Sequence, residues 1–442
     1  MNRIDTATLV LLAALSVPAA LAARQTLKRE EVPRTPVTPA LQEPVPPACP
    51  VLEVPFPELI SIPVLDRPVP PLEGADRLAP FYERMARLLR GNAKDHLRIG
   101  FYSDSNGCKD FLSGELRRFL QLRYGDAGHG WIGLGRPWSW YIHRDIRHGL
   151  DEHLWTSYVV SSLAAPDPYY GHGLIAAETK NKGARTWVGT APASSRIGKT
   201  VSRVEAYYLR RPHSGSFDVL VDGAKIATVA TEGTRIEPGY FSFEVPDAPH
   251  KVTFVADGRG PVRLLGATLE RGAPSIVVDA IGIGGMAWRT WLREDRELDE
   301  AMLRHRNYDL FIVHVGTNSW RKELGREEQT RTILGRLRKA LPEASMLVMS
   351  PGDNQDDPRL IAEELVFEQR RIANDVGAAY FDFHAAMGGK GTVGPYTQRG
   401  LTEGDGVHLN EAGGAYLGRR VLLAFFRGFV EWLRAHPEAG CK

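Results

Sequence analysis

Two short polar stretches carry residue types that can act together in nucleophilic catalysis. Asp104 and Ser105 directly follow a run rich in apolar residues, and Asp405 precedes His408 by three positions. An aspartate at this spacing can reach back to the Nδ1–H of the histidine, fixing the tautomer in which Nε2 faces a serine. We therefore expect Ser105 to attack an acyl carbonyl, His408 to take and return the proton, and Asp405 to orient the ring.

Two further loops could stabilise the negative oxygen that forms during such an attack. Gly285 ends the segment Gly-Ile-Gly-Gly, and Asn318 ends the segment Gly-Thr-Asn. The backbone N–H groups of Ser105 and Gly285 and the side-chain amide of Asn318 are the expected oxyanion donors. Glycine suits position 285 because the backbone there must approach the substrate closely.

Each of these pieces also has a plainer interpretation when taken alone. Asp-Ser-Asn is a good helix cap, Gly-Thr-Asn is a common turn, and Asp-x-x-His could be half of a metal site. The three cysteines, Cys49, Cys108 and Cys441, are too few and too scattered for a disulfide framework or a zinc site, although a Cys49–Cys441 pair is conceivable. We expect neither a metal nor a cofactor.

The order of the predicted elements favours the catalytic interpretation. A strand leads into the Ser105 turn, and a helical period follows as far as Tyr124. From residue 275 strands and helices alternate, which predicts a parallel sheet with helices on both faces. Ligands bind beyond the carboxyl ends of strands in such sheets, and all four pieces fall at these ends. We expect them to meet at one edge.

The stretch 155–272 has a different texture, with short strands of alternating polarity. Asp222-Gly223 supplies a two-residue hairpin turn between two of them. This pattern predicts an all-β sandwich inserted into the α/β domain, which would comprise residues 76–154 and 273–442. Such an insert is a candidate carbohydrate-binding module, although fold alone does not establish binding.

Aromatic side chains gather in the loop after the predicted helix that ends at Tyr124. They could stack on sugar rings, or they could be ordinary packing residues, and the sequence favours neither interpretation. The candidates for substrate binding are Trp131, Trp138, Trp140 and Tyr141.

The N-terminal region indicates export. Residues 1–23 have the basic start, apolar run and small-residue end of a signal peptide, or they form an uncleaved anchor that attaches the protein to a membrane. Residues 24–75 are rich in proline and predict a semi-rigid linker. We expect a periplasmic, cell-envelope or secreted protein. The net charge of +2 gives no reason to expect a nucleic-acid partner.

Taken together, the four blocks resemble those of the SGNH (GDSL-type) hydrolase family. The blocks are Asp104-Ser105, Gly285, Gly316-Thr317-Asn318 and Asp405 to His408, and the stretches IGIGGMAW, AAMGG and DGVHLNEAGG are similar to bacterial peptidoglycan and polysaccharide O-acetylesterases. The resemblance implies a flavodoxin-like three-layer sandwich interrupted by the β insert. Two positions depart from the family pattern: Ser103 replaces the glycine of GDS, and Gly284 replaces an asparagine.

The resemblance implies a serine esterase that removes O-acetyl groups from an acetylated glycan of the cell envelope. Two alternatives use the same residues. One is an acetyltransferase that passes the acyl group to a sugar hydroxyl, and the other is a glycan-binding scaffold with a weakened site. Five further side chains receive structural roles by default, with Cys108 as a packed residue and the others as surface or supporting residues: His129, His143, His148 and His384. The oligomeric state has no signal in the sequence.

Overall fold

The computed structural model describes residues 49–161, 165–319, 323–354 and 362–441. Residues 49–442 form one compact unit. The predicted signal peptide or anchor and the first half of the predicted linker lie outside the described residues. Among the described helices, none combines the length and the apolar character needed to cross a membrane.

A five-stranded parallel sheet forms the centre of the α/β part. Its strands are β1 (Leu97–Ser103), β13 (Ile276–Gly282), β14 (Leu310–His314), β15 (Ser345–Met349) and β16 (Ala379–Phe381), in the spatial order β13-β1-β14-β15-β16. Every residue of these strands is buried, as expected for a sheet covered on both faces. If the five strands are numbered by their order along the chain, their order across the sheet is 2-1-3-4-5, which is the flavodoxin-like order. The direction in which successive strands are added to the sheet reverses at β1.

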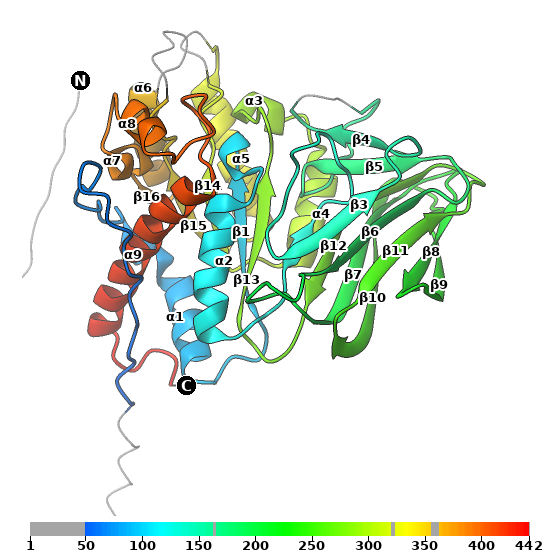
Figure 1. The fold of residues 1–442 in the computed structure, drawn as a ribbon, viewed down its shortest axis with the longest axis horizontal. Coiled ribbons are helices and arrows are strands. Elements are labelled where there is room, and N and C mark those ends of the chain that lie inside the picture. The colour runs from blue at the N-terminus through cyan, green and yellow to red at the C-terminus, as the bar shows by residue number, and fades with distance from the viewer. Residues whose placement is uncertain (1–48, 162–164, 320–322, 355–361, 442) are drawn as a thin grey trace, which may run out of the picture. The chain divides into compact units, whose positions relative to one another are not determined.

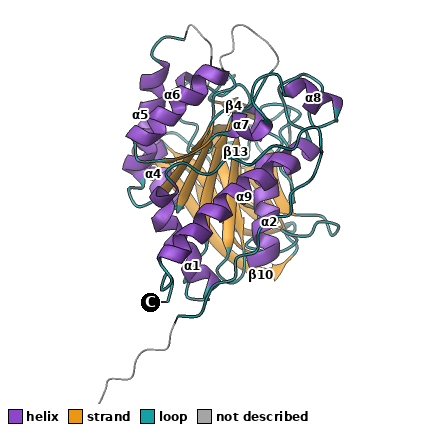
Figure 2. Cartoon of the chain, turned by 90° about the vertical axis from the view of Figure 1, so that its left-hand side faces the viewer, coloured by secondary structure: helices purple, strands orange, loops and turns teal. Residues whose placement is uncertain are grey.

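Helices cover both faces of this sheet, so the predicted three-layer α/β fold is confirmed (Figure 2). One face packs against α1 (Ala79–Leu89), α2 (Phe111–Tyr124) and α9 (Glu411–Ala435). The other packs against α4 (Arg296–Arg306), α5 (Arg326–Ala340) and α6 (Ala362–Asp375). Short helical turns connect these layers: η1 (Ala75–Leu78), η2 (Ser105–Gly107), α3 (Trp288–Trp291), α7 (Phe383–Met387) and α8 (Val393–Gln398).

Two antiparallel sheets form a sandwich beside the parallel sheet (Figure 1). One has the order β10-β7-β12-β5-β4, with β2 also paired to β12, and the other has the order β3-β6-β11-β8-β9. Tyr208 of the first sheet packs edge-on against Phe217 of the second. The strands are β2 (Gly130–Ile132), β3 (Ile146–Leu150), β4 (Thr156–Val159), β5 (Ile175–Thr179), β6 (Arg185–Thr190), β7 (Val201–Arg210), β8 (Ser216–Val221), β9 (Ala224–Ala230), β10 (Glu237–Ala248), β11 (Lys251–Ala256) and β12 (Val262–Glu270).

The sandwich begins earlier in the chain than residue 155, where its start was predicted. Strands β2 and β3 precede that residue, and β2 also contacts the parallel sheet, where the Trp131 N–H donates to Asp279 of β13 at 2.8 Å. Asp279 is held in turn by the buried Arg306, whose guanidinium also binds Glu270 at the end of β12. A backbone hydrogen bond and buried ion pairs therefore join the insert to the parallel sheet. The alternation of polar and apolar residues in the sequence does not reveal this junction.

The last part of the predicted linker also differs from the expectation. Residues 49–75 lie against the folded part, with Leu65, Val69 and Leu72 buried. Glu73 exchanges two backbone hydrogen bonds with Tyr380, each of 2.9 Å. A disulfide between Cys49 and Cys441 joins the start of this segment to the C-terminal end. Burial of apolar side chains among the prolines explains why the segment is ordered.

Candidate active site

Ser105 lies just beyond the carboxyl end of β1, where the order of the sheet reverses. Such a switch point leaves a crevice between loops that diverge to opposite faces. The turn that carries Ser105 packs closely on β13, because a side chain on Gly282 would overlap the backbone of Gly107. Asp104 caps the turn by accepting a hydrogen bond from the Asn106 N–H at 3.2 Å. The Ser105 side chain is consequently held at the rim, half-buried.

Residues far apart in the sequence meet at this serine. The Ser105 Oγ lies 2.8 Å from Nε2 of His408, and Nδ1 of His408 lies 2.6 Å from Oδ2 of Asp405. The other carboxylate oxygen of Asp405 accepts hydrogen bonds from the Val407 and His408 N–H groups, at 3.0 and 2.9 Å. The loop therefore folds back on its own aspartate, as the three-residue spacing predicts.

The charge on Asp405 is stabilised by these contacts. Partial burial alone would raise the pKa of Asp405, but hydrogen bonds from the backbone and ring of His408 and from the Val407 N–H lower it below its usual range. Asp405 is therefore an anion near neutral pH and can stabilise an imidazolium at His408. A hydroxyl, an imidazole and a carboxylate in this order can activate the hydroxyl as a nucleophile.

Asp104 ties the Ser105 turn to the loop that carries Asn318. Its Oδ2 accepts hydrogen bonds from the N–H groups of Gly316 and Thr317, at 3.1 and 2.9 Å. Burial lowers the pKa of the neighbouring His314, although the Asp104 carboxylate opposes this shift, so that ring is neutral near pH 7. Backbone N–H groups, rather than an imidazolium, therefore stabilise the carboxylate of Asp104.

A second tie joins the Ser105 turn to the His408 loop. Oδ1 of Asn106 accepts a hydrogen bond from the Leu409 N–H at 3.0 Å. The sequence pattern does not single out Asn106, because its partner lies 303 positions away. An asparagine directly after the candidate nucleophile Ser105 in a tight turn is the only local signal.

The two other expected oxyanion donors lie on neighbouring loops that contact each other. The amide Nδ2 of Asn318 donates to the Met286 carbonyl at 2.9 Å, next to Gly285. This bond fixes the orientation of the amide while leaving its second N–H for another acceptor. Gly285 has φ of +70°, which favours glycine, and a Cβ there would meet nothing within 4 Å. Its backbone therefore borders open space.

Two of the four aromatic residues expected to bind substrate are core residues instead. Trp131 is 1% exposed and packs on the His172 ring at 4.1 Å between centroids. Tyr141 is 4% exposed, and its hydroxyl accepts a hydrogen bond from the Gly133 N–H. Trp131 is buried because its strand pairs with β12 inside the sandwich. Trp138 and Trp140 lie nearer the surface.

Four of the other residues considered from the sequence, Cys108, His129, His143 and His384, are buried, and His148 is partly buried. Burial raises the pKa of the free thiol of Cys108, so this cysteine is an inert packed residue. His129 and His143 contact each other, and burial lowers the pKa of His143 to about 3 and that of His148 to about 4. Within the described ranges, no group of three or more His, Cys, Asp or Glu side chains could hold a metal ion.

Part of the chain matches a known family, and most of the chain matches a solved structure. Residues 242–416 match the model of the GDSL-like lipase/acylhydrolase family. A solved structure titled as a peptidoglycan O-acetylesterase in action has 22% identity and a TM-score of 0.67, with 82% of this chain and 99% of that chain covered. A search of the curated proteins gave no match.

Weaker likenesses extend to family two carbohydrate esterases. The enzyme from Clostridium thermocellum, in complex with cellohexaose, has 10% identity and a TM-score of 0.27, with 63% of this chain and 100% of that chain covered. The enzyme from Cellvibrio japonicus has 13% identity and a TM-score of 0.24, with 69% and 98% covered. Residues 242–416 are therefore similar to the GDSL-like lipase/acylhydrolase family, and the parallel sheet of flavodoxin-like order agrees with the fold of the structure that has the TM-score of 0.67.

Proposed function

We propose that this protein is an SGNH-type serine esterase that removes O-acetyl groups from peptidoglycan or another polysaccharide of the cell envelope. The observation that carries the proposal is the hydrogen-bonded series from Ser105 through His408 to Asp405. Ser105 Oγ attacks the acetyl carbonyl while His408 Nε2 accepts the hydroxyl proton. His408 then returns this proton to the sugar oxygen as the C–O bond of the ester breaks.

The second half of the reaction reverses these roles. Water loses a proton to His408 and attacks the acetyl group on Ser105, which releases acetate and restores the hydroxyl. The backbone N–H groups of Ser105 and Gly285 and the free amide N–H of Asn318 stabilise the oxyanion in both halves. Preorganised donors of this kind contribute about 10²- to 10³-fold each to the rate.

We propose further that the protein acts outside the cytoplasm, in the periplasm, in the cell envelope or as a secreted enzyme. The Cys49–Cys441 disulfide supports this location, because such bonds persist in oxidising compartments and are rare in the cytosol of most organisms. The signal-like residues 1–23 support it independently of the disulfide.

The direct test compares acetate release from O-acetylated peptidoglycan by the wild type and by Ser105→Ala and His408→Ala. Removing either residue of such a triad lowers the rate by several orders of magnitude. Transfer of acetyl groups to a glycan acceptor, measured in the same reactions, distinguishes hydrolysis from acyl transfer. Undiminished acetate release by both variants would refute the proposal.

A further inference from the structure

A stacked pair of tryptophans lies beside the loop that carries Gly285. The ring centroids of Trp138 and Trp140 are 4.8 Å apart, with 27° between the ring planes. Trp140 is 40% exposed, and Trp138 is half-buried beneath it. The segment that carries both rings runs between β2 and β3, so strands of the sandwich position it. An indole held with one face against a partner is available to a ligand on its other face.

The absence of a side chain at Gly284 allows this arrangement. A Cβ at position 284 would lie 2.9 Å from Cη2 of Trp140 and 3.4 Å from Cη2 of Trp138. Gly284 does not have a left-handed backbone conformation, so the two rings, and not backbone strain, oppose a larger residue here. The Gly284 carbonyl is also held by a hydrogen bond from the Ser161 hydroxyl. The ring pair and the backbone before Gly285 therefore fit each other.

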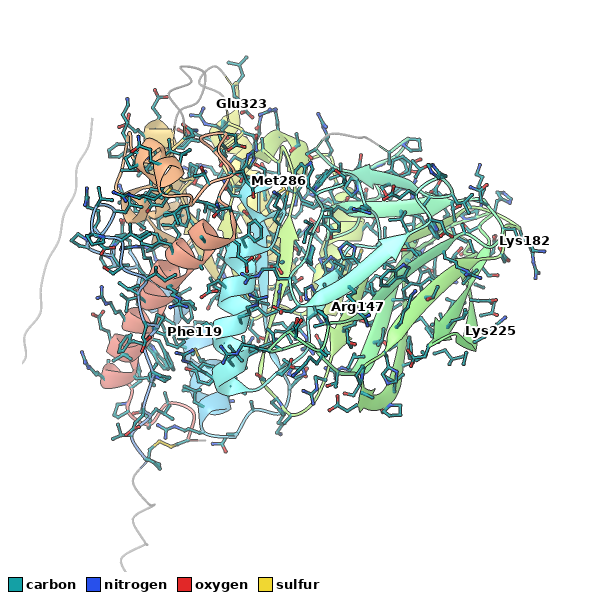
Figure 3. All side chains as sticks on the ribbon, viewed as in Figure 1. Phe119, Arg147, Lys182, Lys225, Met286 and Glu323 are labelled. Atoms are coloured by element: carbon teal, nitrogen blue, oxygen red, sulfur yellow. A yellow bond between two sulfur atoms is a disulfide. The ribbon has the colours of Figure 1, made fainter. Side chains whose placement is uncertain are left out.

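The tryptophans stand at the edge of the candidate active site. In the register of the parallel sheet, Gly282 of β13 is the partner of Ser103 of β1. Gly284 and Ser105 each lie two residues beyond this pair. Met286, labelled in Figure 3, marks the end of β13 from which the Gly284 loop extends. The rings thus lie beside Gly284, one residue before Gly285, which is one of the expected oxyanion donors.

Buried aromatic rings anchor the pair from below. Trp138 packs edge-on against Tyr141, with centroids 6.2 Å apart, and Tyr141 packs edge-on against His143 and His148. Tyr141 and His143 are buried. Trp140 is therefore the exposed end of a series of fixed rings. A ligand that stacks on Trp140 would restrict little side-chain motion, because the surrounding rings already hold the indole in place.

We propose that Trp138 and Trp140 form a pyranose-binding subsite that stacks on the sugar ring bearing the ester. This subsite rests on the proposed function and specifies how the glycan is held. The apolar C–H face of a pyranose matches an indole face, and the sugar hydroxyls point away toward water. This subsite should increase kcat/KM for acetyl esters of sugars and leave kcat/KM for acetyl esters of small alcohols or phenols unchanged.

The test compares full-length wild type with Trp140→Ala on three acetyl esters: O-acetylated peptidoglycan fragments, acetylated xylan and p-nitrophenyl acetate. We expect the ratio of kcat/KM on the preferred carbohydrate ester to kcat/KM on p-nitrophenyl acetate to fall at least ten-fold, mainly through KM. Phe56→Ala is the matched control, because Phe56 is a comparably exposed aromatic residue at 44%. The control should keep the wild-type ratio.

Three outcomes are informative. Equal losses on all three esters in Trp140→Ala would overturn the subsite, since Trp140 would then only support the Gly285 loop. Undiminished activity of Trp140→Ala on both carbohydrate esters would overturn it as well. Full activity of Ser105→Ala on every ester would instead refute the proposed function, and so the two failures are distinguishable.

A double-mutant cycle tests the fit between Gly284 and the rings. Gly284→Leu displaces Trp140 and should lower the substrate ratio about as much as Trp140→Ala does. On the Trp140→Ala background the same substitution should lower the ratio no further, because residues in contact are not additive. Additive losses would contradict the coupling. Gly284→Ala, a smaller change of the same kind, keeps the cycle usable if the leucine variant does not fold.

Discussion

Asp104→Asn tests whether one buried carboxylate holds the loops of the site together. The carboxylate accepts three backbone hydrogen bonds, from Asn106, Gly316 and Thr317. An amide has one oxygen, so at least one of these bonds is lost and its N–H faces an NH₂ group. A hydrogen bond to a charged group contributes about 1.5–3 kcal/mol, and a neutral bond about 0.5–1.5 kcal/mol. One lost bond and two weakened bonds together give about 3–5 kcal/mol.

Urea unfolding and steady-state kinetics on an acetyl ester measure the two expected consequences. We expect the free energy of unfolding to fall by about 3–5 kcal/mol. In the fraction that remains folded, we expect kcat/KM to fall by more than about 100-fold, the effect of losing one oxyanion donor, because the loop bearing Asn318 is no longer fixed. Asp295→Asn is the control: Asp295 caps α4 by accepting from the Leu298 N–H, and asparagine caps equally well. A loss of under about 1 kcal/mol in Asp104→Asn, with unchanged kcat/KM, would refute this reasoning.

Three further predictions concern single groups. Asp405→Asn should lower kcat by about 10³- to 10⁴-fold with little change in thermal stability, because the amide favours the wrong His408 tautomer; a loss under ten-fold in acetyl-ester kinetics would argue against the triad. Burial raises the pKa of Asp299 from 3.8 to about 7, so the free energy of unfolding falls as pH rises from about 4 to 7, where the folded protein holds a proton that the unfolded chain has lost. Asp299→Asn should therefore raise the midpoint of thermal unfolding at pH 8 but not at pH 4. Cys49→Ser should lower the free energy of unfolding by about 2–5 kcal/mol, and equal stability of the oxidised wild type and the variant would contradict this.

The parallel sheet was predictable because its strands are short apolar runs that alternate with helical periods. Leu310 to Val315 and Met346 to Met349 lie in regions with clear boundaries, and their order along the chain fixes which ends share an edge. The Asp405–His408 contact was predictable for a different reason, since it depends on a three-residue spacing within one loop. Both inferences use local information.

Contacts between distant segments could not be predicted in this way. The Asn106 side chain binds the Leu409 backbone, and no periodicity or spacing relates two positions so far apart. The buried Arg306, which joins Asp279 and Glu270, resembles a surface residue of a charged helix in the sequence. Trp131 and Trp140 lie in one aromatic segment, yet only the structure shows that the first is buried and the second exposed.

The position of the insert shows how one chain can join the rigid edge that carries Ser105 to the surface proposed here to bind a glycan. Although β1 and β13 are separated by the whole sandwich, they pair in continuous register from Leu97 with Ile276 to Ser103 with Gly282. A slip of one residue would turn every side chain of β13 to the opposite face, so burial on both faces holds this register strictly. The loop-closure cost rises only slowly with the length of the inserted chain. Segments near β2 and β3 can therefore change, bringing different aromatic rings to the Gly285 loop, while the donors around Ser105 stay in place.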